Sequence, residues 1–223
     1  DGAVLDLLGA AYTGSSADPA AAGAADALTW VPVGELLNGG PSYAGRFDGS
    51  NGTGALVDHL YIDAPDKDYR GLFGYVTDNG SITGVSVGSR SSVTGTGFVG
   101  GVVASFTGDA ISRCSNAAAV RSVDGSQSRI GGVAGSSLSG IYDCCNTGAV
   151  TLGGTGVAGG VAGIGDTTVA SCYNAGPVTG PSGSVLGAIA NADSSFENCF
   201  FDPDASGDAK RANGTYDDET AYP

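Results

Sequence analysis

The chain has 223 residues, of which 40 are glycine and 41% are hydrophobic, and its 23 acidic and 9 basic side chains give a net charge of −14. This balance excludes a nucleic-acid-binding protein, which needs a positive surface, and makes an anionic membrane surface a poor partner. The hydrophobic fraction suits a folded core, whereas no apolar stretch is long enough for membrane insertion as a helix.

The first part of the chain predicts a capping segment followed by short strands. Residues 1–29 are rich in alanine, and we expect a leader there, either a short helix or a segment that closes the first coil. From Trp30 onward short apolar stretches follow, Trp30–Val33, Tyr43–Gly49 and Leu60–Ile62 among them. Their lengths and flanking turn residues are typical of β-strands.

A glycine-rich apolar hexad then recurs five times. The copies align on Gly71, Gly101, Gly132, Gly160 and Ala188, at steps of 30, 31, 28 and 28 residues by subtraction. They span Arg70–Val76, Phe98–Ala104, Ile130–Gly135, Val157–Gly163 and Val185–Asn191. Repeats of this length are typical of solenoids, in which each unit buries its apolar face against its neighbours.

Each hexad leads into a second apolar cluster that carries cysteine in four copies. Three copies continue as Cys-x-Asn-x-(Gly/Ala)-x-Val, beginning at Cys114, Cys144 and Cys172. Cys, Asn and Val lie an even number of residues apart, so an extended chain turns them to one side, but an Ile or Val three residues before the Cys has the opposite parity. Both can face inward only if the chain bends between them, which predicts a corner in every repeat.

These patterns together predict an all-β fold, a right-handed parallel β-helix of about six coils with rungs of 28–31 residues. Residues 30–201 would form this solenoid, and residues 202–223 an acidic C-terminal cap or linker. Equivalent positions would stack into a structural ladder of buried, unbridged thiols and of amides that bond to one another and to the corners. The members of this ladder are Cys114, Cys144, Cys172 and Cys199, and Asn116, Asn146 and Asn174. The fifth cysteine, Cys145, has the opposite parity, and we expect it to face outward as the most reactive thiol.

Few residues predict chemistry. His59 is the single histidine, and without convergent partners it predicts neither a zinc site nor a catalytic triad, but a surface strand residue. The acidic group of Asp58, Asp63, Asp66 and Asp68 has Lys67, Arg70 and Arg46 close in sequence. On a β-helix such a group could bind calcium for a polysaccharide lyase, although a loop of alternating Asp and Pro is more commonly a solvated turn. The aromatics Tyr43, Tyr61, Tyr69 and Tyr75 could form an exposed platform for sugar rings, or they could pack against the entry strands near which they cluster.

The motifs resemble those of the GLUG-motif proteins. The similarity covers Trp30-Val-Pro32, Phe47-Asp-Gly49, Gly71-Leu-Phe-Gly74, and the repeats Ile130–Gly135 with Cys144–Val150. The last repeat departs from the pattern, with Ala188 and Asn191 where glycine is usual. The resemblance implies a secreted or surface-anchored bacterial protein, such as an adhesin or a non-catalytic region of an IgA-specific metallopeptidase.

The sequence therefore predicts a non-enzymatic extracellular repeat module of a bacterial surface protein, an adhesin or stalk that acts through its lateral surface. It needs no cofactor, catalytic residue or metal ligand. Its partner would be a host or cell-surface glycan or protein, and the position of a ligand surface is not predicted. The alternative is the calcium-dependent lyase of the Asp58–Asp68 region. Because the chain contains no Met, we expect it to be part of a longer chain.

Overall fold

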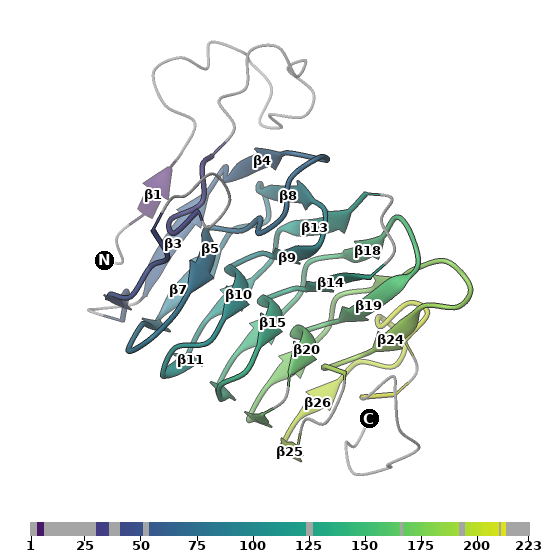
Figure 1. Ribbon diagram of the computed structural model, residues 1–223. Coiled ribbons are helices and arrows are strands. Elements are labelled where there is room, and N and C mark those ends of the chain that lie inside the picture. Colours follow the sequence, from purple (N-terminus) through teal and green to yellow (C-terminus); the bar gives the residue numbers. More distant parts are fainter. Residues whose placement is uncertain are drawn as a thin grey trace.

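The computed structural model describes residues 4–6, 30–35, 41–50, 54–123, 127–165, 167–191, 195–209 and 211–212. In these ranges the chain winds through about five turns of a parallel β-solenoid, which confirms the predicted fold class with about five coils in place of about six. Figure 1 shows the coils following one another from the blue strands β3 and β7 to the yellow strands β25 and β26. No helix occurs in the described ranges, so none there could span a membrane.

Five parallel sheets form the sides of the solenoid. Sheet A consists of β1 (Val4–Asp6), β3 (Ala55–Asp58), β7 (Val85–Val87), β12 (Ser115–Asn116), β17 (Cys145–Asn146), β22 (Tyr173–Asn174) and β26 (Phe200–Phe201). Sheet B consists of β5 (Phe73–Val76), β10 (Val103–Phe106), β15 (Ala134–Ser137) and β20 (Ala162–Gly165). Sheet C consists of β2 (Arg46–Asp48), β6 (Ser81–Thr83), β11 (Ala110–Ser112), β16 (Ile141–Tyr142), β21 (Thr168–Ala170) and β25 (Ser195–Glu197).

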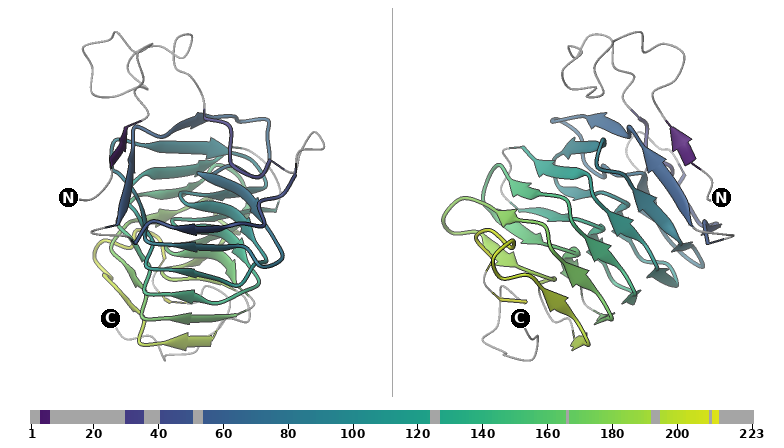
Figure 2. Two further views of the ribbon diagram at one scale, coloured as in Figure 1. Left: turned by 90° about the vertical axis from the view of Figure 1, so that its left-hand side faces the viewer. Right: turned by 180° about the vertical axis from the view of Figure 1, so that it is seen from behind.

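The remaining two sheets complete each coil. Sheet D consists of β4 (Tyr61–Asp63), β8 (Ser92–Gly95), β13 (Ala119–Ser122), β18 (Val150–Leu152) and β23 (Val178–Thr179). Sheet E consists of β9 (Phe98–Gly100), β14 (Ser128–Gly131), β19 (Gly156–Gly159) and β24 (Val185–Gly187). One full coil takes one strand from each sheet in the order E, B, C, A, D, and the two views of Figure 2 show the coils stacked as successive rungs.

The register places equivalent residues of successive repeats on one another. In sheet C the inward column runs Phe47, Ile82, Ile111, Ile141, Val169, Phe196. The four aliphatic members are fully buried. Burial of each such side chain stabilises the fold by about 1.5–3 kcal/mol. The apolar core is therefore a continuous column along the solenoid axis.

A left-handed residue makes the corner between sheets C and A in each coil from β6 and β7 onward. Gly84, Arg113, Asp143, Ser171 and Asn198 occupy this position, with φ between 51° and 68°. Each lies directly before the inward Val or Cys that opens the sheet A segment, and two residues after the inward side chain of sheet C. The positive φ reverses the alternation of side chains, which lets both inward residues reach the core.

The two ends differ from the repeats. In the leader, residues 1–29, the structure describes a strand, β1, which pairs with β3; the helix considered for the rest lies outside the described residues. Trp30 donates from its indole nitrogen to the carbonyl of Leu72 at 3.1 Å and covers the first coil. At the other end Gly207 pairs with Val178, and the amide of Ala188 donates to the carbonyl of Arg211 at 2.6 Å. Residues 213–223 of the predicted cap lie outside the described residues.

Candidate functional site

The four repeat cysteines form a column of buried free thiols along the inner side of sheet A. Each thiol donates to the carbonyl two residues before it. The sulfur-to-oxygen distances are 3.2 Å for Cys114, 3.2 Å for Cys144 and 3.3 Å for Cys172. For Cys199 this distance is 3.6 Å, and the Val169 carbonyl is its closer acceptor at 3.2 Å. Hydrogen bonds with the Cys114 and Cys172 thiols and burial raise the pKa of Cys144, and a hydrogen bond with Cys172 and burial raise the pKa of Cys199. The column therefore packs as small hydrophobic side chains.

Cys145 faces outward between Ser115 and Tyr173 on sheet A and is half-buried. Burial, followed by the nearby Cys172 and Cys114 thiols, raises the pKa of Cys145. A raised pKa lowers the fraction of the reactive thiolate at neutral pH. Cys145 is therefore more accessible than the other four thiols, but its surroundings do not activate it.

The repeat asparagines form an inner ladder beside the thiols. Asn116 donates from Nδ2 to Oδ1 of Asn146 at 2.9 Å, and Asn146 donates in the same way to Asn174 at 2.9 Å. Each side chain also bonds to the residue two positions later, as when Asn146 Nδ2 donates to the Gly148 carbonyl at 2.8 Å and its Oδ1 accepts from the Gly148 amide at 3.3 Å. The amides thus satisfy backbone groups that the fold buries at each corner.

The asparagine ladder explains one glycine of the hexad, which the sequence alone did not reveal. A Cβ on Gly101 would lie 2.2 Å from Oδ1 of Asn116, and one on Gly132 would lie 2.2 Å from the Asn146 carboxamide. At Gly160 the distance to the Asn174 carboxamide would be 2.3 Å. In the last coil Phe201 stands at the asparagine position, and Ala188 stands at the glycine position. Glycine and asparagine in one coil therefore form a single packing unit.

His59 is not the surface strand residue that the sequence predicted. It is 3% exposed and has a φ of 55° in the corner between sheets A and D, so its backbone turns at the point where a strand was expected. Asp58 beside it is also buried and accepts a hydrogen bond from Arg90 Nε at 2.8 Å. The pair forms a buried structural corner in which Arg90 neutralises the carboxylate.

The acidic residues considered for calcium do not form one site. Asp58 is buried beside Arg90, whereas Asp63 is exposed at the end of β4 and Asp66 is exposed on the turn that follows. Across the described ranges, no three Asp, Glu, His or Cys side chains converge in a way that could hold a metal ion. Two of the basic residues considered for catalysis have acidic partners elsewhere: Arg46 pairs with Asp109 at 2.9 Å and Arg70 with Glu35 at 3.0 Å.

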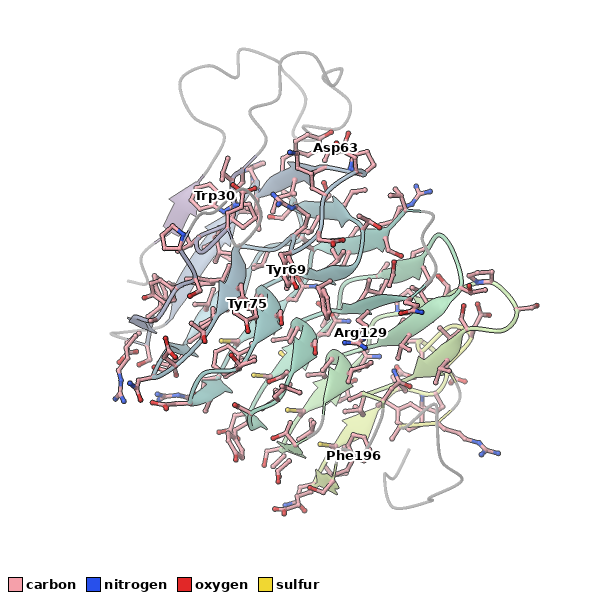
Figure 3. All side chains as sticks on the ribbon, viewed as in Figure 1. Trp30, Asp63, Tyr69, Tyr75, Arg129 and Phe196 are labelled. Carbon is pink, nitrogen blue, oxygen red and sulfur yellow. The ribbon has the colours of Figure 1, made fainter. Side chains whose placement is uncertain are left out.

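The four tyrosines considered for a sugar platform are divided between different places. Tyr43 packs against Phe73 at a ring-centroid distance of 5.3 Å in the first coil. Tyr61 lies on β4 of sheet D. Tyr69 and Tyr75 lie together, at 5.8 Å with their rings nearly perpendicular (Figure 3). Only this last pair contributes to a surface cluster.

We define the aromatic–arginine cluster as Tyr69, Tyr75, Phe98 and Arg129. Tyr69 stacks on Phe98 with centroids 5.0 Å apart and an interplanar angle of 11°, and the Arg129 guanidinium lies over the Phe98 ring at 5.2 Å. All four side chains are half-buried on the outer face, and Figure 3 shows Tyr69 and Tyr75 side by side with Arg129 toward the C-terminal coils. Phe98 had been recognised only as part of a hexad.

The loop before the first hexad holds Tyr69 in place. Tyr69 has a φ of 56°, and the next residue, Arg70, is 3% exposed and donates from Nε to the Asp68 carbonyl at 2.8 Å. Burial, followed by the charge of Asp68, raises the pKa of Tyr69, so the phenol stays protonated at neutral pH. The cluster therefore presents phenolic hydroxyl groups, ring edges and a guanidinium on one rigid surface. Rings with polar ends next to a cation can pack against an apolar face and bond to hydroxyl or carboxylate groups.

Comparison with known proteins supports the fold. No protein-family model and no curated protein sequence matches the chain. The chain is similar to the crystal structure of a protein described as a "putative immunoglobulin A1 protease" from Bacteroides ovatus, with a TM-score of 0.58 and 17% sequence identity. The similarity covers 89% of this chain and 71% of that chain. At this identity the likeness establishes a shared β-solenoid fold, and the GLUG resemblance stays a prediction.

Proposed function

We propose that the chain is a non-enzymatic, extracellular repeat module of a bacterial surface or secreted protein. It acts as an adhesin or stalk and engages its partner through its lateral surface. Its place would be the cell surface or the medium, and its partner a glycan or protein there. The resemblance to GLUG-motif proteins and the fold shared with a chain described as a "putative immunoglobulin A1 protease" support this proposal.

One observation carries the proposal: the interior of the solenoid is closed. The asparagine ladder fills the space beside Gly101, Gly132 and Gly160, and buried aliphatic side chains and thiols fill the rest. Side chains available to a partner are therefore those of the outer columns. Such a body suits presentation and binding along an extended surface, as in other repeat proteins.

The aromatic–arginine cluster is the part of the lateral surface that we assign to binding. Among the half-buried outer residues it combines stacked rings with a cation, and it lies on strands and a tightly held loop rather than on a mobile segment. Its chemistry fits a glycan, whose ring faces are apolar and whose hydroxyl groups need donors and acceptors.

A glycan-array screen of the fluorescently labelled chain tests this assignment. Tyr69→Ala combined with Arg129→Ala should reduce binding to any recognised glycan by about tenfold or more, since loss of an aromatic and a charged contact removes about 1.4 kcal/mol or more. The control is Tyr142→Ala, which removes an exposed tyrosine from sheet C and should leave binding unchanged. Absence of any glycan or host-matrix ligand would contradict the adhesin role, and equal loss in the control would contradict the placement at the cluster.

A further inference from the structure

Among the described residues, part of the backbone edge of the last coil has no strand partner. Strands β25 and β26 are the terminal members of sheets C and A. The chain that follows turns away over the other sides, where Gly207 pairs with Val178 and Ala212 accepts from the amides of Ile189 and Ala190. Within the described residues no strand pairs with the outer edges of β25 and β26.

The hydrogen bonds between the preceding coils show which backbone groups this edge presents. On sheet A the amide of each outward residue donates to the cysteine carbonyl of the coil before: Cys145 to Cys114, Tyr173 to Cys144 and Phe200 to Cys172, each at 3.0 Å. In the last coil, the equivalent acceptor is the carbonyl of Cys199, and the next acceptor along the strand is the carbonyl of Phe201. On sheet C the Ser171 amide donates forward to the Glu197 carbonyl at 2.8 Å, and the next donor in this series is the Asn198 amide. No described residue bonds to these three groups.

Exposed aromatic side chains flank the open edge. Tyr173 is 42% exposed and Phe200 is 48% exposed, and they are direct neighbours in the outer column of sheet A. Phe196 lies half-buried at the same end of the molecule (Figure 3). An open strand edge with apolar side chains beside it is a template for another strand.

The charge around the edge indicates which kind of partner can bind there. Residues 127–212 contain seven acidic side chains and three basic side chains, Arg129, Lys210 and Arg211. Glu197 is exposed beside the Asn198 amide, and Asp202 follows Phe201 directly. A second copy of the chain would bring a like-charged rim to the edge, and residues 213–223 carry Asp217, Asp218 and Glu219 without a basic side chain. Both self-association through this edge and pairing of the edge with residues 213–223 are thus disfavoured.

We propose that the β25–β26 edge binds an extended, basic peptide segment of another protein by strand addition. Amides of its outward residues donate to the carbonyls of Cys199 and Phe201, which lie past the left-handed corner at Asn198. Its lysine or arginine side chains, on the outward face, contact Glu197, Asp202 and the ring of Phe200. This edge is separate from the aromatic–arginine cluster. If no peptide binds the edge, the proposal that the cluster binds a glycan is therefore unaffected.

The test uses the whole chain and two labelled hexapeptides of alternating sequence, Lys-Val-Lys-Val-Lys-Val and Glu-Val-Glu-Val-Glu-Val. Fluorescence anisotropy should give a dissociation constant at least about tenfold lower for the lysine peptide, and added salt should weaken its binding. Methylation of the lysine amide nitrogens should abolish binding, because these amides face the edge, whereas methylation of the valine amide nitrogens should not. Phe200→Ala and Glu197→Gln should each weaken binding several-fold, and the distant, exposed Asp78→Asn should leave it unchanged.

Four outcomes of the peptide-binding experiment would overturn the proposal. The first is equal affinity for the two peptides, or binding of neither peptide. The second is binding that does not change on methylation of the lysine amide nitrogens, and the third is binding that does not change in Phe200→Ala and Glu197→Gln. The fourth is binding that appears only after deletion of residues 213–223. Sedimentation that shows a dimer dissociated by Glu197→Lys would assign the edge to a second copy and would equally contradict a basic peptide.

Discussion

At the scale of single residues, the fold depends on small groups of side chains that fit only together. Asn146 is the central example. It bonds to Asn116 and Asn174 in the neighbouring coils and to both backbone groups of Gly148, while its carboxamide occupies the space that a side chain on Gly132 would need. Removal of one partner therefore leaves several buried polar groups without a bond.

Asn146→Ala should lower the free energy of unfolding by about 2–4 kcal/mol, because each polar group left unsatisfied costs about 1–3 kcal/mol. The shift in the midpoint of urea unfolding measures this loss. The neighbouring, exposed Thr147→Ala is the matched control and should change stability by less than about 0.5 kcal/mol. Equal stability of the two variants would show that the ladder is absent.

Gly132→Ala tests the glycine side of the same unit. The new methyl group would lie 2.2 Å from the Asn146 carboxamide and 2.3 Å from the Gly160 carbonyl, so we expect a loss of more than about 3 kcal/mol or failure to fold. Ala188→Gly in the last coil should cost less than about 1.5 kcal/mol, since alanine already fits there. A well-folded Gly132→Ala protein of unchanged stability would be incompatible with the observed packing.

The thiols give a residue-scale prediction with a pH dependence. In the native chain, a disulfide reagent such as Ellman's reagent should label Cys145 slowly at neutral pH and faster at alkaline pH, because its raised pKa keeps the thiol protonated at neutral pH. Cys114, Cys144, Cys172 and Cys199 should react only after unfolding. Cys145→Ser should abolish native labelling; rapid labelling of more than one thiol per native chain would rule out the buried column.

The raised pKa values of two column thiols set the sign of their own alkaline effect on stability, whereas hydrogen bonds with Cys144 lower the pKa of Cys114 and Cys172, whose effect has the opposite sign. The pKa of Cys144 and of Cys199 is raised in the folded state, so their folded environment favours the neutral thiol. Their contribution to stability is complete below the unfolded thiol pKa of about 8.5 and is lost as the pH rises above it.

At the scale of elements, the left-handed corner decides how strands of sheets C and A follow each other. Four of its five occupants are not glycine: Arg113, Asp143, Ser171 and Asn198. Outside glycine this backbone conformation is costly, least so for Asn and Asp and most for β-branched residues. The corner is thus a place where the core on both sides imposes a conformation on the residue.

Asp143→Gly should give a protein at least as stable as the original, whereas Asp143→Val should lose about 1–2 kcal/mol, because valine is strained at positive φ. Thermal unfolding of the two variants measures the difference. Tyr142→Val, one residue earlier in an extended segment, is the control for the loss of an exposed side chain and should be near neutral. An Asp143→Val variant as stable as Asp143→Gly would contradict the left-handed corner.

The sequence was sufficient for the period, for the parallel sheets and for the corners, because these follow from the spacing of Ile111 and Cys114 and of their equivalents. It did not predict the aromatic–arginine cluster. The hexads step by 30 residues between Gly71 and Gly101, but Arg70 pairs with Val99, which is a step of 29. A one-residue difference moves a side chain to the other face of a strand, so the stacking of Tyr69 on Phe98 could not be read from the glycine alignment. The burial of His59 depends on a positive φ, which no local sequence pattern predicts.

At the scale of the whole molecule, every coil contacts mainly its two neighbours, so stability and function are distributed along one axis. The N-terminal coils carry most of the arginines and the aromatic–arginine cluster, whereas the C-terminal coils are acidic and end at an open edge. A chain of this kind separates lateral recognition from contacts at its end. All of these statements depend on the stacking of equivalent residues in neighbouring coils.

Distances between spin labels test this stacking most directly. In a Cys145→Ser background, one pair is placed at Thr83→Cys and Glu197→Cys on sheet C, and a second pair at Ser86→Cys and Phe200→Cys on sheet A. Both pairs are four coils apart in the outer columns. Four rises of about 4.8 Å predict the same backbone separation of about 19 Å for both pairs. Two clearly different separations, or values far above this one, would contradict the solenoid.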